Sequence, residues 1–225
     1  MLVKIDILTL FPEMFKGPFD TSIVKRAKSR DLIEINVHDL RKWGEGIRRD
    51  VDDRPYGGGV GMILRVDIID AALKDLRTKK SKIILLDATG TKYDEAKAKN
   101  FSKEEHIILI AGHYEGVDHR VHENLVDEVV SIGDYVLTGG EIPAMAIVDS
   151  VIRLIPGVLG KDESSEVESH MTPGYLEYPQ YTRPEKYKDW NVPEVLLSGN
   201  HAEIKSWRDK ASNEAVTLRD KKSGV

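Results

Sequence analysis

Glycine residues end three apolar runs of the chain, which read "KIILLDATG", "HIILIAGHYEG" and "DEVVSIGDYVLTGGE". Because glycine has no side chain, backbone N–H and C=O groups at these points can approach a ligand closely. A single glycine of this kind usually serves only to make a tight turn. Three such loops in series favour a small-molecule pocket lined by backbone atoms. The glycines concerned are Gly90, Gly112, Gly116, Gly133, Gly139 and Gly140.

A second candidate for chemistry is the stretch "KDESSEVESHM", residues 161–171. It holds four acidic residues, three serines and almost no apolar side chain. This composition is typical of a mobile tether, because it cannot bury enough apolar surface to become ordered. One of its carboxylates could also act as a general base. Composition alone leaves both interpretations open.

Other reactive patterns in the sequence are weaker. Asp118, His119, His122 and Glu123 could crowd a metal ion, but nothing else completes a ligand set, so a solvated helix face is favoured. The segment "GGGVGM" does not fit the dinucleotide-binding pattern G-x-G-x-x-G, and no P-loop pattern occurs. No G-x-S-x-G motif supports a hydrolase triad. The chain has no cysteine, which excludes disulfides and thiolate metal sites.

The elements that must position these residues are expected to alternate along the chain. Residues 4–8 and 33–40 have the alternation of strands, and the three glycine-terminated runs are further strands. Helical patterns fill most of the gaps between them, including one that follows a turn at residues 11–15 and continues through residue 32, one capped by Asp67, and one over residues 142–155 with Pro143 at its start. This order predicts an α/β domain with a mainly parallel sheet over residues 1–160. Ligands of such sheets bind at the carboxyl ends of the strands.

The lengths of the apolar runs and the distribution of charge bear on the partners and the location of the protein. No apolar run reaches the roughly 18 residues that span a bilayer, and the first ten residues contain lysine and aspartate, unlike a signal peptide, so a cytoplasmic protein is expected. A net charge of −5 argues against nonspecific nucleic-acid binding, although residues 205–222 are net basic. We expect residues 161–171 to be a flexible linker and residues 172–225 to form a small, mostly helical module with Asn200 as a helix cap. Residues 41–64, rich in glycine and charge, are expected to form a functional or mobile loop.

Six motifs together resemble the bacterial tRNA (guanine-N1)-methyltransferase family: "VDDRPYGGGVGM", "GHYEGVD", "SIGDYVLTGGEIPAM", "IPGVLG", "YTRPE" and "VLLSGNHAEI". The resemblance implies the SPOUT-type fold, in which the parallel sheet carries a deep trefoil knot, and a homodimer. It implies transfer of a methyl group from S-adenosylmethionine to N1 of the guanosine 3′ of the anticodon, position 37 of tRNA. It also implies that the C-terminal module binds tRNA, and that the module is shortened relative to the family.

The resemblance places the cofactor against the three glycine-bearing loops. The implied cofactor-binding residues are Leu86, Asp87, Ala88, Thr89 and Gly90 in the first loop; Gly112, Tyr114, Glu115 and Gly116 in the second; and Ser131, Ile132, Gly133, Asp134, Tyr135, Val136, Leu137, Gly139, Gly140 and Pro143 in the third. Glu115 is suited to the cationic end of the methionine moiety, or to Mg²⁺, which is described for the family. No residue set is assigned as a metal site.

The resemblance also implies two catalytic residues. Arg153 matches the family's arginine that faces guanine O6. The family's general base, an aspartate followed by serine, corresponds to Glu168, with Glu166 and His170 as alternatives. Candidate RNA-binding residues include the basic stretch from Lys205 to Lys222 and the segment "RKWGEGIRRD". The aromatic residues Tyr178, Tyr181, Tyr187 and Trp190 could include a base-stacking surface.

Two alternative functions stay open on the sequence. One is a related knotted RNA methyltransferase with a different RNA target. The other is a catalytically weak RNA-binding relative, for which the glutamate in place of aspartate at residue 168 is an argument.

Overall fold

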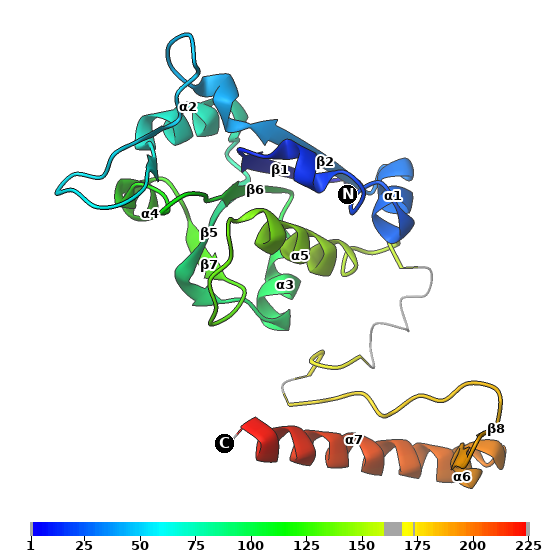
Figure 1. The fold of residues 1–225 in the computed structure, drawn as a ribbon. Helices are drawn as coiled ribbons and strands as arrows, with labels where there is room; N and C mark the ends of the chain where they lie inside the picture. Colours follow the sequence, from blue (N-terminus) through cyan, green and yellow to red (C-terminus); the bar gives the residue numbers. More distant parts are fainter. Residues whose placement is uncertain (1, 160–167, 173, 224–225) are drawn as a thin grey trace. The chain divides into compact units, whose positions relative to one another are not determined.

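The computed structural model of the chain describes residues 2–159, 168–172 and 174–223 (Figure 1). The chain divides into two compact units, residues 1–160 and residues 161–225. In the described ranges, every helix is too short or too polar to traverse a lipid bilayer.

The first unit is built on five strands in the order β2-β1-β6-β5-β7, and every neighbouring pair is parallel. The strands are β1 (Val3–Thr9), β2 (Ile33–Asp39), β5 (Ser81–Lys92), β6 (His106–Ala111) and β7 (Glu128–Ser131). All six residues of β6 are buried, as expected of a central strand that is covered on both faces. The predicted α/β class with a mainly parallel sheet is confirmed.

Helices cover both faces of this sheet (Figure 1). On one face lie α1 (Ser22–Ser29), α3 (Glu95–Phe101) and α5 (Glu141–Ile152), together with the short 3-10 helix η1 (Pro12–Phe15). The other face is covered by α2 (Val66–Leu76), α4 (His119–Asn124) and the 3-10 helix η2 (Leu40–Trp43). A two-stranded ladder, β3 (Asp52–Asp53) with β4 (Ile63–Leu64), closes the base of the long loop between η2 and α2.

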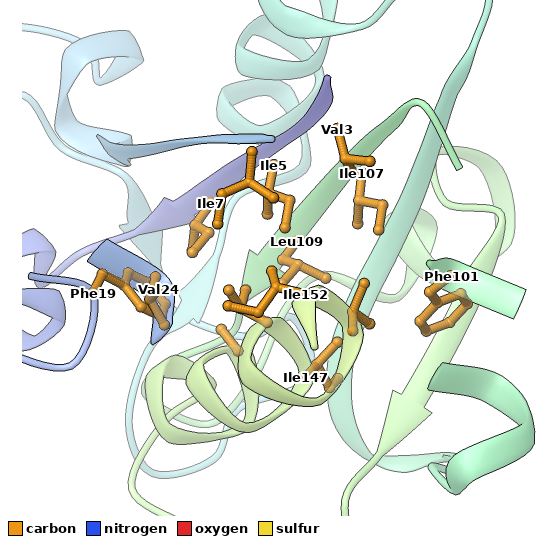
Figure 2. Packing of buried hydrophobic residues seen from close by; sticks show 14 of the residues in the cluster. Val3, Ile5, Ile7, Phe19, Val24, Phe101, Ile107, Leu109, Ile147 and Ile152 are labelled. Atoms are coloured by element: carbon orange, nitrogen blue, oxygen red, sulfur yellow. The ribbon is translucent and has the colours of Figure 1, made fainter. Parts of the chain in front are cut away.

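The two buried clusters follow from strand alternation. Ile107 and Leu109 of β6 pack in the cluster beneath α5, whereas Ile108 packs in the cluster beneath α2. Successive side chains of a strand point to opposite faces, so one short apolar run supplies both clusters. Figure 2 shows the first cluster, with Ile147 and Ile152 of α5 in the same layer as these strand residues.

Local boundaries differ from the sequence-based expectation at three points. The N-cap of α2 is Arg65 and not Asp67, whose carboxylate instead accepts a hydrogen bond from the Arg65 guanidinium at 3.1 Å. The predicted turn at residues 11–15 forms η1, and the helix that follows begins only at Ser22 as α1, because a turn at Gly17 with positive φ separates them. The run that ends in Gly90 does not stop in a loop. It continues as β5, which pairs with β7 on both sides of an irregular segment between Leu86 and Thr91.

The second unit contains the hairpin of β8 (Lys186–Tyr187) and β9 (Trp190–Asn191), followed by α6 (Glu194–Leu197) and α7 (His201–Ser223). The predicted cap is confirmed, because the Asn200 side-chain oxygen accepts from the backbone N–H groups of Ala202 and Glu203 at 3.2 and 3.4 Å. Residues 168–172 are hydrogen-bonded to residues 175–177, and the Ser169 hydroxyl accepts from the Glu177 N–H at 2.8 Å. The rest of the predicted linker, including Glu166, lies outside the described residues.

Candidate functional site

A cavity of about 230 Å³ lies beside the irregular segment of β5 and the ends of β6 and β7. Its walls come from that segment of β5 and from the ends of β6 and β7 with the loops that follow them, close to the place that the carboxyl-end rule for parallel sheets predicts. The lining residues are Leu86, Asp87, Ala88, Gly112, His113, Tyr114, Glu115, Gly116, Val130, Ser131, Ile132, Gly133, Tyr135, Val136, Leu137, Thr138, Gly139, Gly140 and Pro143.

The structure brings together nearly all of the predicted cofactor-binding residues at this cavity. Thr89, Gly90 and Asp134 are the members of the predicted set that do not line it. Sequence reasoning missed three lining residues, His113, Val130 and Thr138. His113 and Thr138 stand inside the motifs "GHYEG" and "VLTGG", between residues that were predicted, so continuity of the loop was the available signal.

Each of the excluded residues has another role. A Cβ on Gly90 would lie 2.5 Å from the backbone nitrogen of Val130, so this glycine permits the close pairing of β5 with β7. The Thr89 hydroxyl donates to the Asp87 carboxylate at 2.7 Å. The carboxylate of Asp134 is exposed and pairs with the Lys92 ammonium group at 3.2 Å.

At Gly140, the third loop lies against the backbone at the end of β6. The Gly140 N–H donates to the carbonyl oxygen of Gly112 at 2.7 Å. A Cβ on Gly140 would lie only 2.6 Å from the Ala111 Cα atom, a separation that real contacts essentially never show. Glycine at residue 140 is therefore required by close approach and not by its own dihedral angles, which lie in the right-handed region at φ −82° and ψ −1°.

The long glycine-rich loop lies along the second cavity loop. The Glu115 N–H donates to the Met62 carbonyl at 3.0 Å, and the Leu64 N–H donates to the Gly116 carbonyl at 3.0 Å. A Cβ on Gly61 would lie 2.3 Å from the Cγ atom of Glu115, so the glutamate side chain occupies the space that Gly61 leaves. Part of the predicted functional loop thus holds the carboxylate that was assigned to a cationic ligand.

Asp87 brings a charged group into the cavity wall. Burial acts to raise the pKa of Asp87, but hydrogen bonds from the hydroxyl and N–H of Thr89, together with nearby His122, hold the pKa below its ordinary value. The His122 Nε2 atom lies 3.4 Å from the Asp87 carboxylate. An ionised carboxylate in a cavity is suited to accept hydrogen bonds from ligand hydroxyl groups.

Arg153 does not line this cavity. Arg153 is the half-buried C-cap of α5, whose first residue, Glu141, adjoins the cavity loop. At a rise of about 1.5 Å per residue, the helix separates its two ends by roughly 18 Å. Glu168 is half-buried in the turn of the second unit.

No group of three histidine, aspartate or glutamate side chains is arranged to hold a metal ion, as far as the chain is described. The side chains that the sequence suggested as possible metal ligands, Asp118, His119, His122 and Glu123, contact other protein groups instead. Asp118 caps α4, accepting from the Arg120 N–H at 2.9 Å, and pairs with the Arg120 guanidinium at 2.7 Å. His119 lies 3.7 Å from Glu123 on the same helix.

Comparison with known proteins gives a consistent result. The model of the family described as "tRNA (Guanine-1)-methyltransferase TrmD" matches residues 3–222. A tRNA (guanine-N(1)-)-methyltransferase of Dictyoglomus turgidum is 50% identical over 218 residues, which cover 97% of this chain and 88% of the relative. The proteins of the same name from Bacillus subtilis and Bacillus pumilus are 50% and 52% identical over 220 residues, which cover 96% of this chain and 90% of each relative.

Proposed function

The chain belongs to the tRNA (guanine-1)-methyltransferase family, and we propose that it transfers a methyl group from S-adenosylmethionine to N1 of a guanosine in tRNA. The observation that carries this proposal is the cavity that most of the residues implied for the cofactor line. We place the target guanosine at position 37, 3′ of the anticodon, on the strength of the six motifs.

The residues of the cavity fit S-adenosylmethionine in kind. Leu86, Ile132 and Leu137 offer apolar walls to an adenine ring, and the glycines leave backbone groups open for hydrogen bonds. The ionised Asp87 suits the ribose hydroxyls, and Glu115 suits the amino group of the methionine part. The same glutamate is the candidate contact for Mg²⁺. When bound, S-adenosylmethionine supplies a methyl group on a sulfonium sulfur, which keeps the electron pair of the broken carbon–sulfur bond.

Residues of the chain must remove one proton from the base and stabilise the negative charge that develops on it. Guanine N1 carries a proton at neutral pH, so Glu168 takes that proton while the N1 lone pair forms the new bond to the methyl carbon. Negative charge builds toward O6 of the base, where the Arg153 guanidinium donates hydrogen bonds. An arginine suits this planar, electron-rich base edge better than a lysine.

We propose that the reaction takes place in a homodimer of knotted subunits. The support is the separation, along α5, of Arg153 from the cavity of its own chain. In a twofold-symmetric dimer, a surface of one subunit can complete the cavity of the other, and both sites then form at once. Arg153 and Glu168 would be supplied to each cavity by the partner subunit or by the second unit.

We propose that the second unit binds the tRNA. In the β8–β9 hairpin, the residues Tyr187 and Trp190 are 55% and 68% exposed, and their ring centroids lie 5.8 Å apart. The Lys188 ammonium lies 5.4 and 5.7 Å from their centroids. Exposed aromatic rings beside a cation match the chemistry of unpaired bases and phosphates in a tRNA loop. The reaction is expected in the cytoplasm, where such a substrate is found.

The primary experiment is methyl transfer from radiolabelled S-adenosylmethionine to an unmodified tRNA transcript with guanosine at position 37. A transcript with adenosine at that position is the control. We expect label only in the guanosine transcript and its recovery as N1-methylguanosine. Label that appears in both transcripts, or in another base, would point to a different RNA target.

The catalytic assignments are tested by Glu168→Ala and Glu168→Gln. Both variants should lower turnover by about 100-fold, the scale of a general base, with little change in the affinity for S-adenosylmethionine. Wild-type turnover in Glu168→Ala would move the role to Glu166 or His170.

The dimeric site is tested by mixing two inactive variants, Gly140→Ala in the cavity and Glu168→Ala. If each site uses the cavity of one subunit and Glu168 of the other, heterodimers regain one complete site. The mixture should then reach about a quarter of the wild-type rate, because half of the randomly mixed dimers are heterodimers. An inactive mixture, despite subunit exchange, would mean that each chain supplies both groups itself.

A further inference from the structure

Glu141 is a buried carboxylate beside the cavity that the proposed reaction does not use. It is the first residue of α5, and it is 1% exposed. An acidic group is favourable at a helix N-terminus, because the helix dipole is positive there. Burying a carboxylate is nevertheless costly unless other groups satisfy it. The partners of Glu141 therefore indicate what its burial achieves.

One partner of Glu141 is Thr9, which lies 132 residues away in the sequence. The hydroxyl of Thr9, the last residue of β1, is buried and donates to Glu141 Oε1 at 2.8 Å. The same hydroxyl accepts from the Phe11 N–H at 2.9 Å. Glu141 thus joins the start of α5 to the carboxyl end of a sheet strand that does not line the cavity.

The other partner belongs to the second cavity loop. His113 Nδ1 lies 3.8 Å from Glu141 Oε2. This nitrogen is buried and has no hydrogen-bond partner among the residues that the structure describes. A contraction of less than 1 Å would convert the pair into a charge-assisted hydrogen bond. The imidazole is held from its sides by Phe11 and Tyr114, whose ring centroids lie 4.6 and 5.2 Å away.

The third cavity loop passes directly against this pair. A Cβ on Gly139 would lie 2.3 Å from Glu141 Oε2 and 2.6 Å from His113 Nδ1. The carboxylate and the imidazole therefore fill the space beside Gly139, and they determine how close the third loop can come to the second. Three segments that are distant in sequence meet at one carboxylate.

We propose that Glu141 is a positioning residue for the cofactor cavity. Through Thr9 and His113 its carboxylate holds the second and third cavity loops at the spacing that S-adenosylmethionine requires. This role rests on the proposed function for its ligand, but the spacing of the loops is a property of the protein alone. Glu141 touches neither the methyl group nor the base.

The experiment compares three variants with a matched control. Glu141→Gln keeps the shape of the side chain and the acceptor for Thr9, but removes the charge that faces His113. Thr9→Val removes the hydroxyl and keeps the carboxylate, and Thr9→Ser restores the hydroxyl. The control is Tyr93→Phe, which removes a partly buried hydrogen bond of 2.7 Å to Ser150 on the same helix α5; neither residue lines the cavity.

Two readouts are measured on the full chain. Hydrogen–deuterium exchange of the unliganded protein should rise in residues 112–116 and 131–140 for Glu141→Gln and Thr9→Val. Titration calorimetry should show S-adenosylmethionine affinity reduced about 10-fold, equivalent to about 1.4 kcal/mol, with turnover at saturating cofactor almost unchanged. Thr9→Ser should restore both readouts, and Tyr93→Phe should lower thermal stability without changing either one.

Each outcome bears on one claim. If Glu141→Gln and Thr9→Val lose stability as Tyr93→Phe does, with loop exchange and affinity unchanged, Glu141 is an ordinary core residue and the inference is wrong. If Glu141→Gln fails to fold, Thr9→Val decides, since it retains the charge. If the wild-type chain does not bind S-adenosylmethionine, the proposed function fails, while the exchange data still decide whether Glu141 positions the loops.

Discussion

Replacing Gly140 with alanine should disrupt the cofactor cavity without straining the backbone of residue 140. Its φ of −82° and ψ of −1° are accessible to alanine, so any effect comes from the added methyl group. That methyl would lie 2.6 Å from the Ala111 Cα atom and 2.8 Å from the Gly112 nitrogen. To reach an ordinary contact of 3.4 Å, the backbones must separate by 0.8 Å, because no flexible side chain can move aside instead.

The cost of this separation can be worked from the contacts involved. Overpacking of a well-packed region costs about 1–3 kcal/mol, and the hydrogen bond from Gly140 to Gly112 contributes about 0.5–1.5 kcal/mol. We therefore expect the free energy of unfolding to fall by about 2–4 kcal/mol. Displacement of the cavity wall by nearly 1 Å should lower kcat/KM for methyl transfer by about 100-fold.

The assays are urea unfolding, calorimetric titration with S-adenosylmethionine and methyl transfer to tRNA. Gly17→Ala is the control, because Gly17 has a φ of +93° and open space around its Cβ position. It should lose about 1–2 kcal/mol of stability through backbone strain and keep its cofactor affinity. Gly140→Ala with wild-type affinity and turnover would refute the close-approach argument.

Three further predictions concern other parts of the first unit. Gly61→Ala should displace the Glu115 side chain and lower turnover more than Gly57→Ala, whose φ of +84° gives similar strain in open space; equal kinetics for the two variants would contradict this. Gly90→Ala should destabilise the first unit strongly in urea unfolding, because its Cβ would lie 2.5 Å from the backbone of β7, and an unchanged midpoint would rule out that contact. Burial acts to raise the pKa of Asp6. Hydrogen bonds from two histidines, a lysine and an asparagine lower this pKa by more than burial raises it, so the folded-state pKa lies below its ordinary value. The stabilisation of the folded state by ionised Asp6 is fully present above the unfolded carboxyl pKa of about 3.9, and it is lost as the pH falls from there through the folded-state pKa. The difference in the free energy of unfolding between wild type and Asp6→Asn should therefore narrow below about pH 4. A difference that stays constant with pH would argue against a lowered pKa of Asp6.

Much of the fold was predictable because its signals are local. After His106, the run "HIILIA" of β6 is apolar, which indicates a strand covered on both faces, and the structure buries all six residues. The Asn200 side chain caps α7 because a short amide can reach the first free N–H groups of a helix. The glycines after the strands pointed to a backbone-lined cavity at the end of the sheet, and the cavity lies there.

Other features could not be predicted from short segments of the sequence. The role of Gly90 depends on Val130, and the burial of Glu141 depends on Thr9, which is 132 residues away in the chain. Sequence periodicity reports which face of an element is apolar, but not which backbone will lie across it. For that reason the first glycine was assigned to a ligand loop when it serves strand pairing, and His113 was overlooked.

The sequence by itself determined the class of the first unit and the end of the sheet where the cavity lies, and six motifs indicated the family and its chemistry. The class and the position of the cavity follow from alternation and residue types, which each short segment carries on its own, and the family follows from the resemblance of its motifs. Only the tertiary structure decided which glycines line the cavity and which lie against another backbone, as Gly90 does and as Gly140 does in addition to lining the cavity. It alone joined Thr9, His113 and Glu141 beside the cavity, because contacts between distant segments arise when the sheet assembles and leave no local pattern in the chain.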